Sequence, residues 1–242
     1  MKLIAYLSNG FPSLDDSLQR AIDFVNAGVD IIEADLPSPD PYLDSDYLKQ
    51  RIFAALAQES DYELYMTSLL ELKRRLPQAG FMINIYVETL DQMGVDRFSR
   101  FMDDMGEKEI LLVGPGYAEL RAALEERGYH ASSFVTRAML EQDLALAGKT
   151  NGFIYLEAFG DETTYSMTYP TLRDCVAKVR EVIGPERHIY CGIGIHTAER
   201  LAEVRDSRAD GAFLGSIVLR KEDNKEEQLS FIRELRRIAD GT

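Results

Sequence analysis

Residues 26–46 read "NAGVDIIEADLPSPDPYLDSD" and contain the pattern that determines the fold. A helical segment passes through Gly28 into an almost continuous apolar run, "VDIIEAD" at 29–35. Such a run is typical of a parallel strand that is covered on both faces. The same joint recurs in "DMGEKEILL", "KTNGFIYL" and "SRADGAFLG". Its repetition predicts a chain in which parallel strands alternate with helices.

Eight apolar segments fit such strands: "LIAYLS" (3–8), "VDIIEAD" (29–35), "FMINIYV" (81–87), "EILLV" (109–113), "HASSFV" (130–135), "GFIYLEA" (152–158), "HIYCGI" (188–193) and "GAFLGS" (211–216). Helical patterns lie between them; in "LDDSLQRAIDFVNAG", Leu18, Ile22 and Val25 fall on one face. Residues 46–76 are numerous enough for an extra helix. Eight βα units without a linker predict one (β/α)8 barrel domain over 1–242, in preference to a doubly wound sheet.

The bulk composition limits the function. The net charge of −14 argues against binding to nucleic acid or to a membrane surface, because both are anionic. Cys175 and Cys191 form no C-x-x-C pair, so neither a disulfide framework nor a zinc site is expected. The start "MKLIAYLSNG" lacks the apolar length of a signal peptide, and no stretch is as long as a membrane span. We therefore expect a cytoplasmic protein.

Active residues of a barrel lie where the strands end and the βα loops begin. Glu33 follows two isoleucines inside a predicted buried strand, where loss of water raises the pKa of a carboxyl and suits it to acid/base catalysis. Alternatively, Glu33 is a structural carboxylate that is hydrogen-bonded to a neighbouring strand. Three prolines stiffen the following loop, which suits the presentation of Asp40 or Asp44 at a fixed place; a solvated surface crossover is the alternative.

Glycine turns end the last two predicted strands, in "YCGIGIHT" and "FLGSIV". Backbone N–H groups there can approach a phosphate, or the glycines serve only tight turns. His196 could bind the same anion or act as a polar neighbour of a helix cap. Tyr86 and Tyr155 could line an aromatic pocket or fill the top of the barrel, and Tyr6 is expected on the same pocket wall. The predicted phosphate-binding residues are Gly192, Gly194, Gly215 and Ser216.

From "YLSNGFP" to "FLGSIVLRK", the chain resembles the tryptophan synthase α subunit family. Its segment "AGVDIIEADLPSPDPYLDSD" is similar to the family stretch A-G-A-D-x-x-E-x-G-x-P-F-S-D-P-x-A-D-G-P, which puts Glu33 and Asp44 on the two catalytic carboxylates. "MGVDRF" resembles the segment that follows the third strand, so Tyr86 and Tyr155 fall on pocket tyrosines. "GIGI" and "GS" fall on the phosphate-binding turns.

The resemblance implies a lyase of tryptophan biosynthesis. The family cleaves indole-3-glycerol phosphate to indole and glyceraldehyde 3-phosphate in a retro-aldol reaction without a metal or an organic cofactor. It implies that Glu33 is the acid/base and that Asp44 stabilises charge at the indole N–H. It also implies a β subunit as partner, with the loop at 37–46 near that interface.

The sequence departs from the family at several loops. Ser45-Asp46 replaces G-P, Glu88 replaces an asparagine, and "GPG" at 114–116 replaces D-x-P. The glycine-rich loop G-V-T-G becomes "GDETTYS" from Gly160, whose acids would repel a nearby phosphate by about a kcal/mol or more. Two alternatives therefore stay open: a divergent barrel enzyme with a different small substrate, phosphorylated or not, and a non-catalytic subunit that binds a partner.

Overall fold

A computed structural model describes residues 1–116 and 118–242. The chain divides into two compact units. The first-half unit comprises residues 6–26 and 31–131, and the second-half unit comprises residues 1–5, 27–30 and 132–242. The first strand, β1 (Lys2–Leu7), contributes residues to both units.

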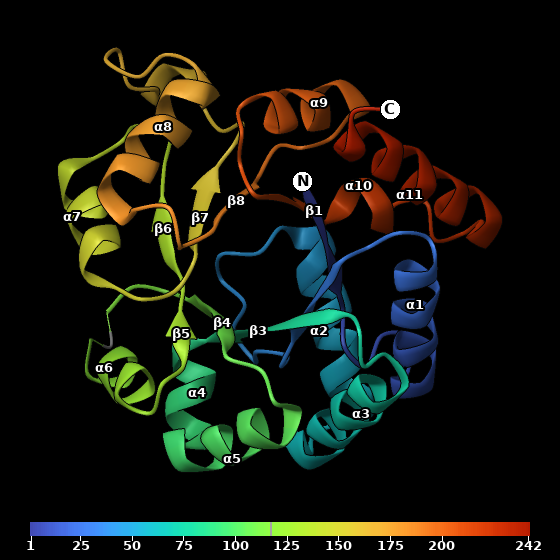
Figure 1. Ribbon diagram of the computed structural model, residues 1–242. Helices are drawn as coiled ribbons and strands as arrows, with labels where there is room; N and C mark the ends of the chain where they lie inside the picture. The colour runs from blue at the N-terminus through green and yellow to red at the C-terminus, as the bar shows by residue number, and fades with distance from the viewer. Residues whose placement is uncertain (117) are drawn as a thin grey trace. The chain divides into compact units, whose positions relative to one another are not determined.

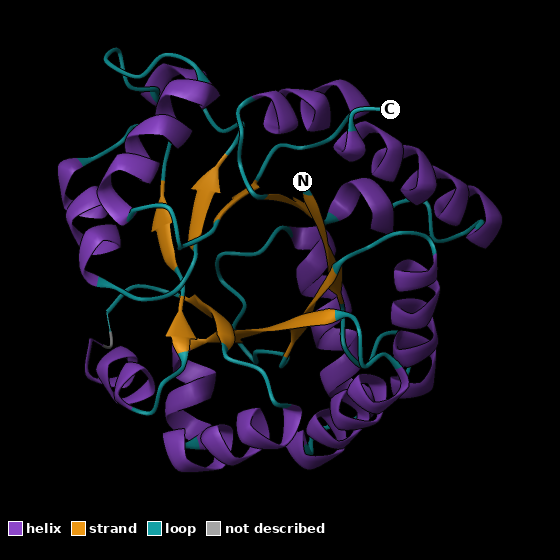
Figure 2. Cartoon of the chain, viewed as in Figure 1, coloured by secondary structure: helices purple, strands orange, loops and turns teal. Residues whose placement is uncertain are grey.

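The first-half unit holds four neighbouring parallel strands in the order β5-β4-β3-β2. Figure 2 shows these strands lying inside the helices of the same unit. Asp35 on β2 pairs with Asn84 on β3, and the Leu36 N–H donates to the Asn84 carbonyl, so the pairing continues past the strand end. The elements are α1 (Leu14–Asn26), β2 (Ile31–Asp35), α2 (Asp46–Gln58), α3 (Tyr62–Arg75), β3 (Gly80–Tyr86), α4 (Val87–Met93), α5 (Val95–Met105), β4 (Glu109–Val113), α6 (Ala118–Glu126) and β5 (His130–Ala131).

The second-half unit orders its parallel strands β1-β9-β8-β7-β6. The first strand therefore pairs with the last, with Lys2 opposite Gly211. Arg236 on the C-terminal helix, which runs beside α9 (Figure 1), binds Asp30 at 2.6 Å and the Met1 carbonyl at 2.7 Å. The elements are β6 (Ser133–Val135), α7 (Glu141–Lys149), β7 (Ile154–Glu157), the 3-10 helix η1 (Glu162–Thr164), α8 (Leu172–Ile183), β8 (Ile189–Gly192), α9 (Ala198–Asp206), β9 (Gly211–Leu214), α10 (Ser216–Leu219) and α11 (Lys225–Asp240).

The alternation of parallel strands and helices confirms the predicted (β/α)8 barrel class. All eight predicted strand segments contain strand, and residues 46–76 form the two helices α2 and α3. The segment 130–135 differs from its prediction, because it splits at Ser132 into β5, which pairs with β4, and β6, which pairs with β7. Two different pairing partners account for the ninth strand.

The apolar face of α1 is rotated from its predicted position. Ser17, Ala21 and Phe24 are the buried residues of the helix, whereas Leu18 and Ile22 are only partly buried. The buried face therefore combines the large Phe24 with the small residues Ser17 and Ala21, and the helix packs against α3. Within residues 1–116 and 118–242, none of the helices has both the length and the apolar character that crossing a bilayer demands.

Candidate active site

Strand β2 carries two buried carboxylates on one face. Glu33 and Asp35 are two residues apart, so their side chains project to the same side of the strand. Glu33 is 6% exposed and Asp35 is 4% exposed. Two acids of this kind are rarely buried without partners, because an ionised carboxylate loses strong hydration.

Glu33 has one hydrogen-bond donor, the Asn84 side chain, whose Nδ2 donates to Glu33 Oε1 at 2.8 Å. This is the contact to a neighbouring strand that a purely structural role for Glu33 requires. The pKa of Glu33 is nevertheless raised to about 8, mainly by burial and in smaller part by the negative charges of Asp44 and Asp35, although the Asn84 hydrogen bond lowers it. The carboxyl is therefore able to hold or release a proton near neutral pH, as a general acid must.

Asp35 is held by two donors from the β1 end of the unit. The Tyr6 hydroxyl donates to Oδ2 at 2.9 Å, and the Asn9 backbone N–H donates to Oδ1 at 2.6 Å. Burial raises the pKa of Asp35 to about 7, although both hydrogen bonds lower it. Asp35 lies close enough to Glu33 for its charge to act on the Glu33 carboxyl.

The loop after β2 brings Asp44 toward the end of β3. The Tyr86 hydroxyl donates to Asp44 Oδ2 at 2.6 Å and accepts the Leu43 N–H at 3.2 Å. Burial raises the pKa of Asp44, and its charge in turn raises the pKa of Glu33. Asp40 is exposed, so the solvated interpretation applies to that acid. The structure thus brings Glu33 and Asp44, with Tyr6 and Tyr86, into one group of interacting side chains.

Comparison with known proteins places the chain in a family. The sequence profile of the family described as "Tryptophan synthase alpha chain" matches residues 1–240. The chain belongs to the tryptophan synthase alpha chain family. The alpha chain of Leifsonia xyli is 30% identical over 225 residues, which cover 90% of this chain and 84% of that protein. The alpha chain of Caldicellulosiruptor saccharolyticus is 23% identical over 240 residues, covering 97% and 92%.

Solved structures have the same fold. A protein from Aquifex aeolicus superposes with a TM-score of 0.85 at 20% identity, covering 98% of this chain and 92% of the other. A structure of tryptophan synthase from M. tuberculosis gives a TM-score of 0.82 at 21% identity, with coverage of 98% and 92%. At these identities the likeness concerns the fold alone.

Two departures from the tryptophan synthase alpha chain pattern acquire a structural explanation. Ser45, which replaces the glycine after the second catalytic-type aspartate, is the N-cap of α2, and its hydroxyl accepts the Leu48 N–H at 3.4 Å. Glu88, in the first turn of α4, accepts a hydrogen bond from the Tyr42 hydroxyl at 3.1 Å. Both changes fasten the loop that carries Asp44.

The two glycines of "GIGI" fit a packing role. A Cβ on Gly192 would lie 2.0 Å from the Tyr155 hydroxyl oxygen. A Cβ on Gly194 would lie 2.0 Å from the Phe159 carbonyl oxygen, and its φ of +75° is in the left-handed region. Close contacts with the protein therefore explain both glycines without an anion.

The second glycine turn fits the anion prediction better. A Cβ on Gly215 would meet nothing within 4 Å. The next residue, Ser216, shares a pocket with three basic side chains, of which Lys221 is ion-paired with Glu227 at 2.6 Å. The pocket is lined by His196, Ser216, Ile217, Arg220, Lys221 and Phe231. Its basic character is suitable for a phosphate group.

Two further predicted features, Tyr155 on β7 and the acidic loop that follows this strand, make contacts within the second-half unit. Tyr155 stacks on Phe213 with ring centroids 4.5 Å apart, so it packs within an aromatic cluster of the second-half unit. The Asp161 carboxylate accepts hydrogen bonds from the Thr163 N–H at 3.0 Å and from the Thr163 hydroxyl at 2.7 Å. These bonds lower the pKa of Asp161, so its ionised carboxylate is stabilised by a residue of its own loop.

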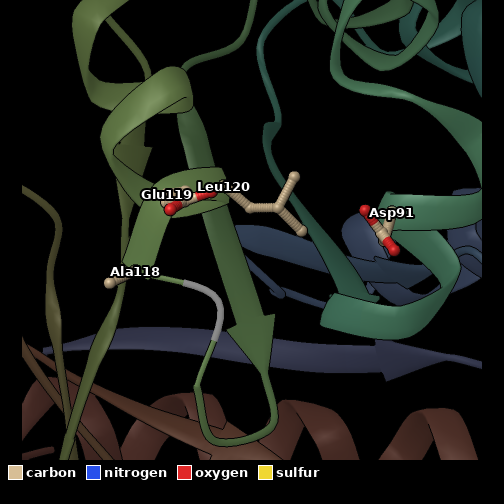
Figure 3. A pocket seen from close by; sticks show the side chains of 4 residues that line it. All are labelled: Asp91, Ala118, Glu119 and Leu120. Carbon is tan, nitrogen blue, oxygen red and sulfur yellow. The ribbon is translucent and has the colours of Figure 1, made fainter.

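A further pocket lies between α4 and α6 (Figure 3). Asp91, Ala118, Glu119 and Leu120 line it, and Leu120 points toward Asp91. Among the described lining residues, none is basic or nucleophilic beside the carboxylates of Asp91 and Glu119. None of Glu33, Asp35 and Asp44 is among them. The carboxylates of β2 therefore remain the candidate for acid/base chemistry.

Sequence reasoning gave no role to Asp35, Asn9 and Asn84. The spacing of Glu33 and Asp35 was a usable signal, because alternate residues of a strand share a face. The contacts of Asn9 and Asn84 connect residues 26 and 51 positions apart, and these separations have no local pattern.

Proposed function

We propose that this chain cleaves indole-3-glycerol phosphate to indole and glyceraldehyde 3-phosphate. The proposal rests on the interaction of Glu33 with Asp44 in a chain of the tryptophan synthase alpha chain family. A carboxyl with its pKa near 8 stays protonated at neutral pH and is able to protonate indole C3. The same group, once ionised, accepts the proton of the adjacent glycerol hydroxyl as the carbon–carbon bond breaks.

Asp44 has the complementary role in this proposal. Its carboxylate accepts a hydrogen bond from the indole N–H, where positive charge develops after protonation of C3. Tyr86 positions Asp44 through the 2.6 Å hydrogen bond. In the second-half unit, the pocket of Ser216 is the proposed phosphate site. In the first-half unit, Tyr6 is the proposed contact for an aromatic ring. No cofactor takes part in these steps.

We further propose the assembly and setting of the enzyme. Residues 1–242 act as one barrel domain, a tryptophan synthase β subunit binds near the loop at 37–46, and the protein works in the cytoplasm. The tightened loop after β2, with Leu43 63% exposed, supports a docking role for that segment.

The direct test is indole release from indole-3-glycerol phosphate by the purified chain, with and without a β subunit. Glu33→Gln should abolish turnover without lowering the melting temperature, whereas Glu119→Gln, at an exposed site on α6, should retain it. A folded wild-type chain that releases no indole in either condition would refute the proposal.

A second candidate function is cleavage of a different small substrate by the same carboxylates. It is favoured by Asp35, which occupies the position of a glycine in the family stretch. Turnover of a related substrate, with indole-3-glycerol phosphate left intact and the same dependence on Glu33, would establish this alternative.

A further inference from the structure

Asn9 carries a buried amide with unused hydrogen-bonding capacity. It lies two residues beyond the end of β1, and its side chain is 1% exposed. Within the described part of the chain, neither Nδ2 nor Oδ1 has a hydrogen-bond partner. Such groups are rare in folded proteins, because burial removes their bonds to water without replacing them. The amide therefore has one donor group and one acceptor ready for a ligand.

The residue bound to Asn9 is the one that departs from the family stretch. Asp35 stands where that stretch has a glycine, so this chain places a carboxylate where the family pattern has no side chain. Its two oxygens accept the Asn9 N–H and the Tyr6 hydroxyl. Tyr6 is 5% exposed, so the three residues form a buried polar group around Asp35, which shares a face of β2 with Glu33.

The chemistry of this group selects one kind of ligand. An ammonium ion only donates hydrogen bonds and would leave the Asn9 amide N–H groups without an acceptor. A carboxylate or phosphate would be repelled by the carboxylates of Asp35 and Asp44. A hydroxyl both accepts from the Asn9 Nδ2 and donates to a carboxylate or to the Asn9 Oδ1, so it satisfies the site.

We propose that Asn9, Asp35 and Tyr6 form a polar subsite beside Glu33 that binds a hydroxyl group of the substrate. The inference builds on the proposed lyase function and names a specificity element of that site. The hydroxyl has two possible sources, the glycerol chain of indole-3-glycerol phosphate or a hydroxylated indole ring, and two sets of measurements distinguish them.

The first measurement concerns the glycerol chain. In a Glu33→Gln background, which prevents cleavage, calorimetry gives the Kd of indole-3-glycerol phosphate and of indole-3-propanol phosphate, which lacks the chain hydroxyls. If the chain supplies the hydroxyl, Asn9→Leu weakens the first ligand about tenfold, the value of one lost hydrogen bond, and leaves the second within about twofold.

The second measurement concerns the ring and uses the reverse condensation of glyceraldehyde 3-phosphate with indole or with 4-, 5-, 6- or 7-hydroxyindole. If the ring supplies the hydroxyl, Asn9→Leu lowers the rate with one hydroxyindole about tenfold and leaves the rate with indole unchanged. Tyr6→Phe removes only a hydroxyl and is the second variant in both arms.

Ser99→Ala is the matched control. Ser99 on α5 is also buried, at 8% exposure, with an Oγ that lacks a partner within residues 1–116 and 118–242. This variant should change neither measurement. A selective loss in either arm supports the subsite and identifies the source of the hydroxyl.

Equal effects of Asn9→Leu and Tyr6→Phe on hydroxylated and hydroxyl-free ligands in both arms would overturn the subsite. If wild type still condenses indole in that case, the lyase proposal stands alone. If wild type neither binds nor condenses any of these compounds, both proposals fail.

Discussion

Replacing Glu33 with glutamine should make the stability of the protein less sensitive to alkaline pH. Glutamine keeps the shape of the side chain and an oxygen that accepts from Asn84, but it cannot ionise. Burial raises the pKa of Glu33 from 4.5 to about 8, so the folded wild type binds a proton that the unfolded chain releases. Ionisation of the buried Glu33 therefore lowers the free energy of unfolding of the wild type. This loss is absent below pH 4.5, grows between pH 4.5 and about pH 8, and reaches about 5 kcal/mol above pH 8.

Urea unfolding of both proteins at pH 5.5, 7 and 9 measures this effect. The free energy of unfolding of Glu33→Gln, relative to wild type, should increase by about 3 kcal/mol from pH 5.5 to pH 9. Asp35 titrates in both proteins and therefore largely cancels from the difference. Glu119→Gln, at an exposed position, should run parallel to wild type. A Glu33→Gln difference that stays constant across this range would mean that water reaches the Glu33 carboxyl, and the general-acid argument would fail.

Three further variants test the neighbouring contacts. Tyr86→Phe removes the donor to Asp44, so indole release should fall about tenfold, with a loss of about 1 kcal/mol in unfolding free energy; unchanged kcat would exclude Tyr86 as a positioning residue. Gly192→Ala should lower unfolding free energy by about 1–3 kcal/mol, because its Cβ meets the Tyr155 hydroxyl; a stable variant would show that this tyrosine moves freely. Gly215→Ala should leave the melting temperature unchanged and raise KM for the phosphorylated substrate, since its methyl group enters open space beside the proposed phosphate site; an unchanged KM would place the phosphate elsewhere.

The elements of the fold were accessible from sequence because they depend on local patterns. The apolar run at 29–35 and the glycine joints located the strands to within a few residues. The break at Ser132 was not accessible, because it arises from the different pairing partners of β5 and β6. The buried face of α1 was misjudged because it includes the small residues Ser17 and Ala21, which a pattern of large apolar side chains does not identify.

The site was accessible only where chemistry followed local position. Glu33 could be proposed because it lies in a predicted buried strand. The proline-rich loop left Asp40 and Asp44 as alternatives, and the family resemblance selected Asp44. The amide donor Asn84 is 51 residues from Glu33, and Asn9 is 26 residues from Asp35. Such contacts depend on strand order and register, which amino-acid spacing does not specify. The role of Gly192 likewise depends on Tyr155, which lies on a different strand.

The pairing of β1 with β9 has a consequence for how the protein is made. A ribosome releases the first strand long before its partner exists, and the bond between Asp30 and Arg236 joins residues 206 positions apart. Until β9 is made, the backbone groups of β1 that will pair with it stay without hydrogen-bond partners from that strand, while β2, β3 and β4 already have neighbours to pair with. Truncation before β9 should consequently leave that edge unpaired and promote aggregation, even though the proposed catalytic carboxylates lie far upstream in the chain.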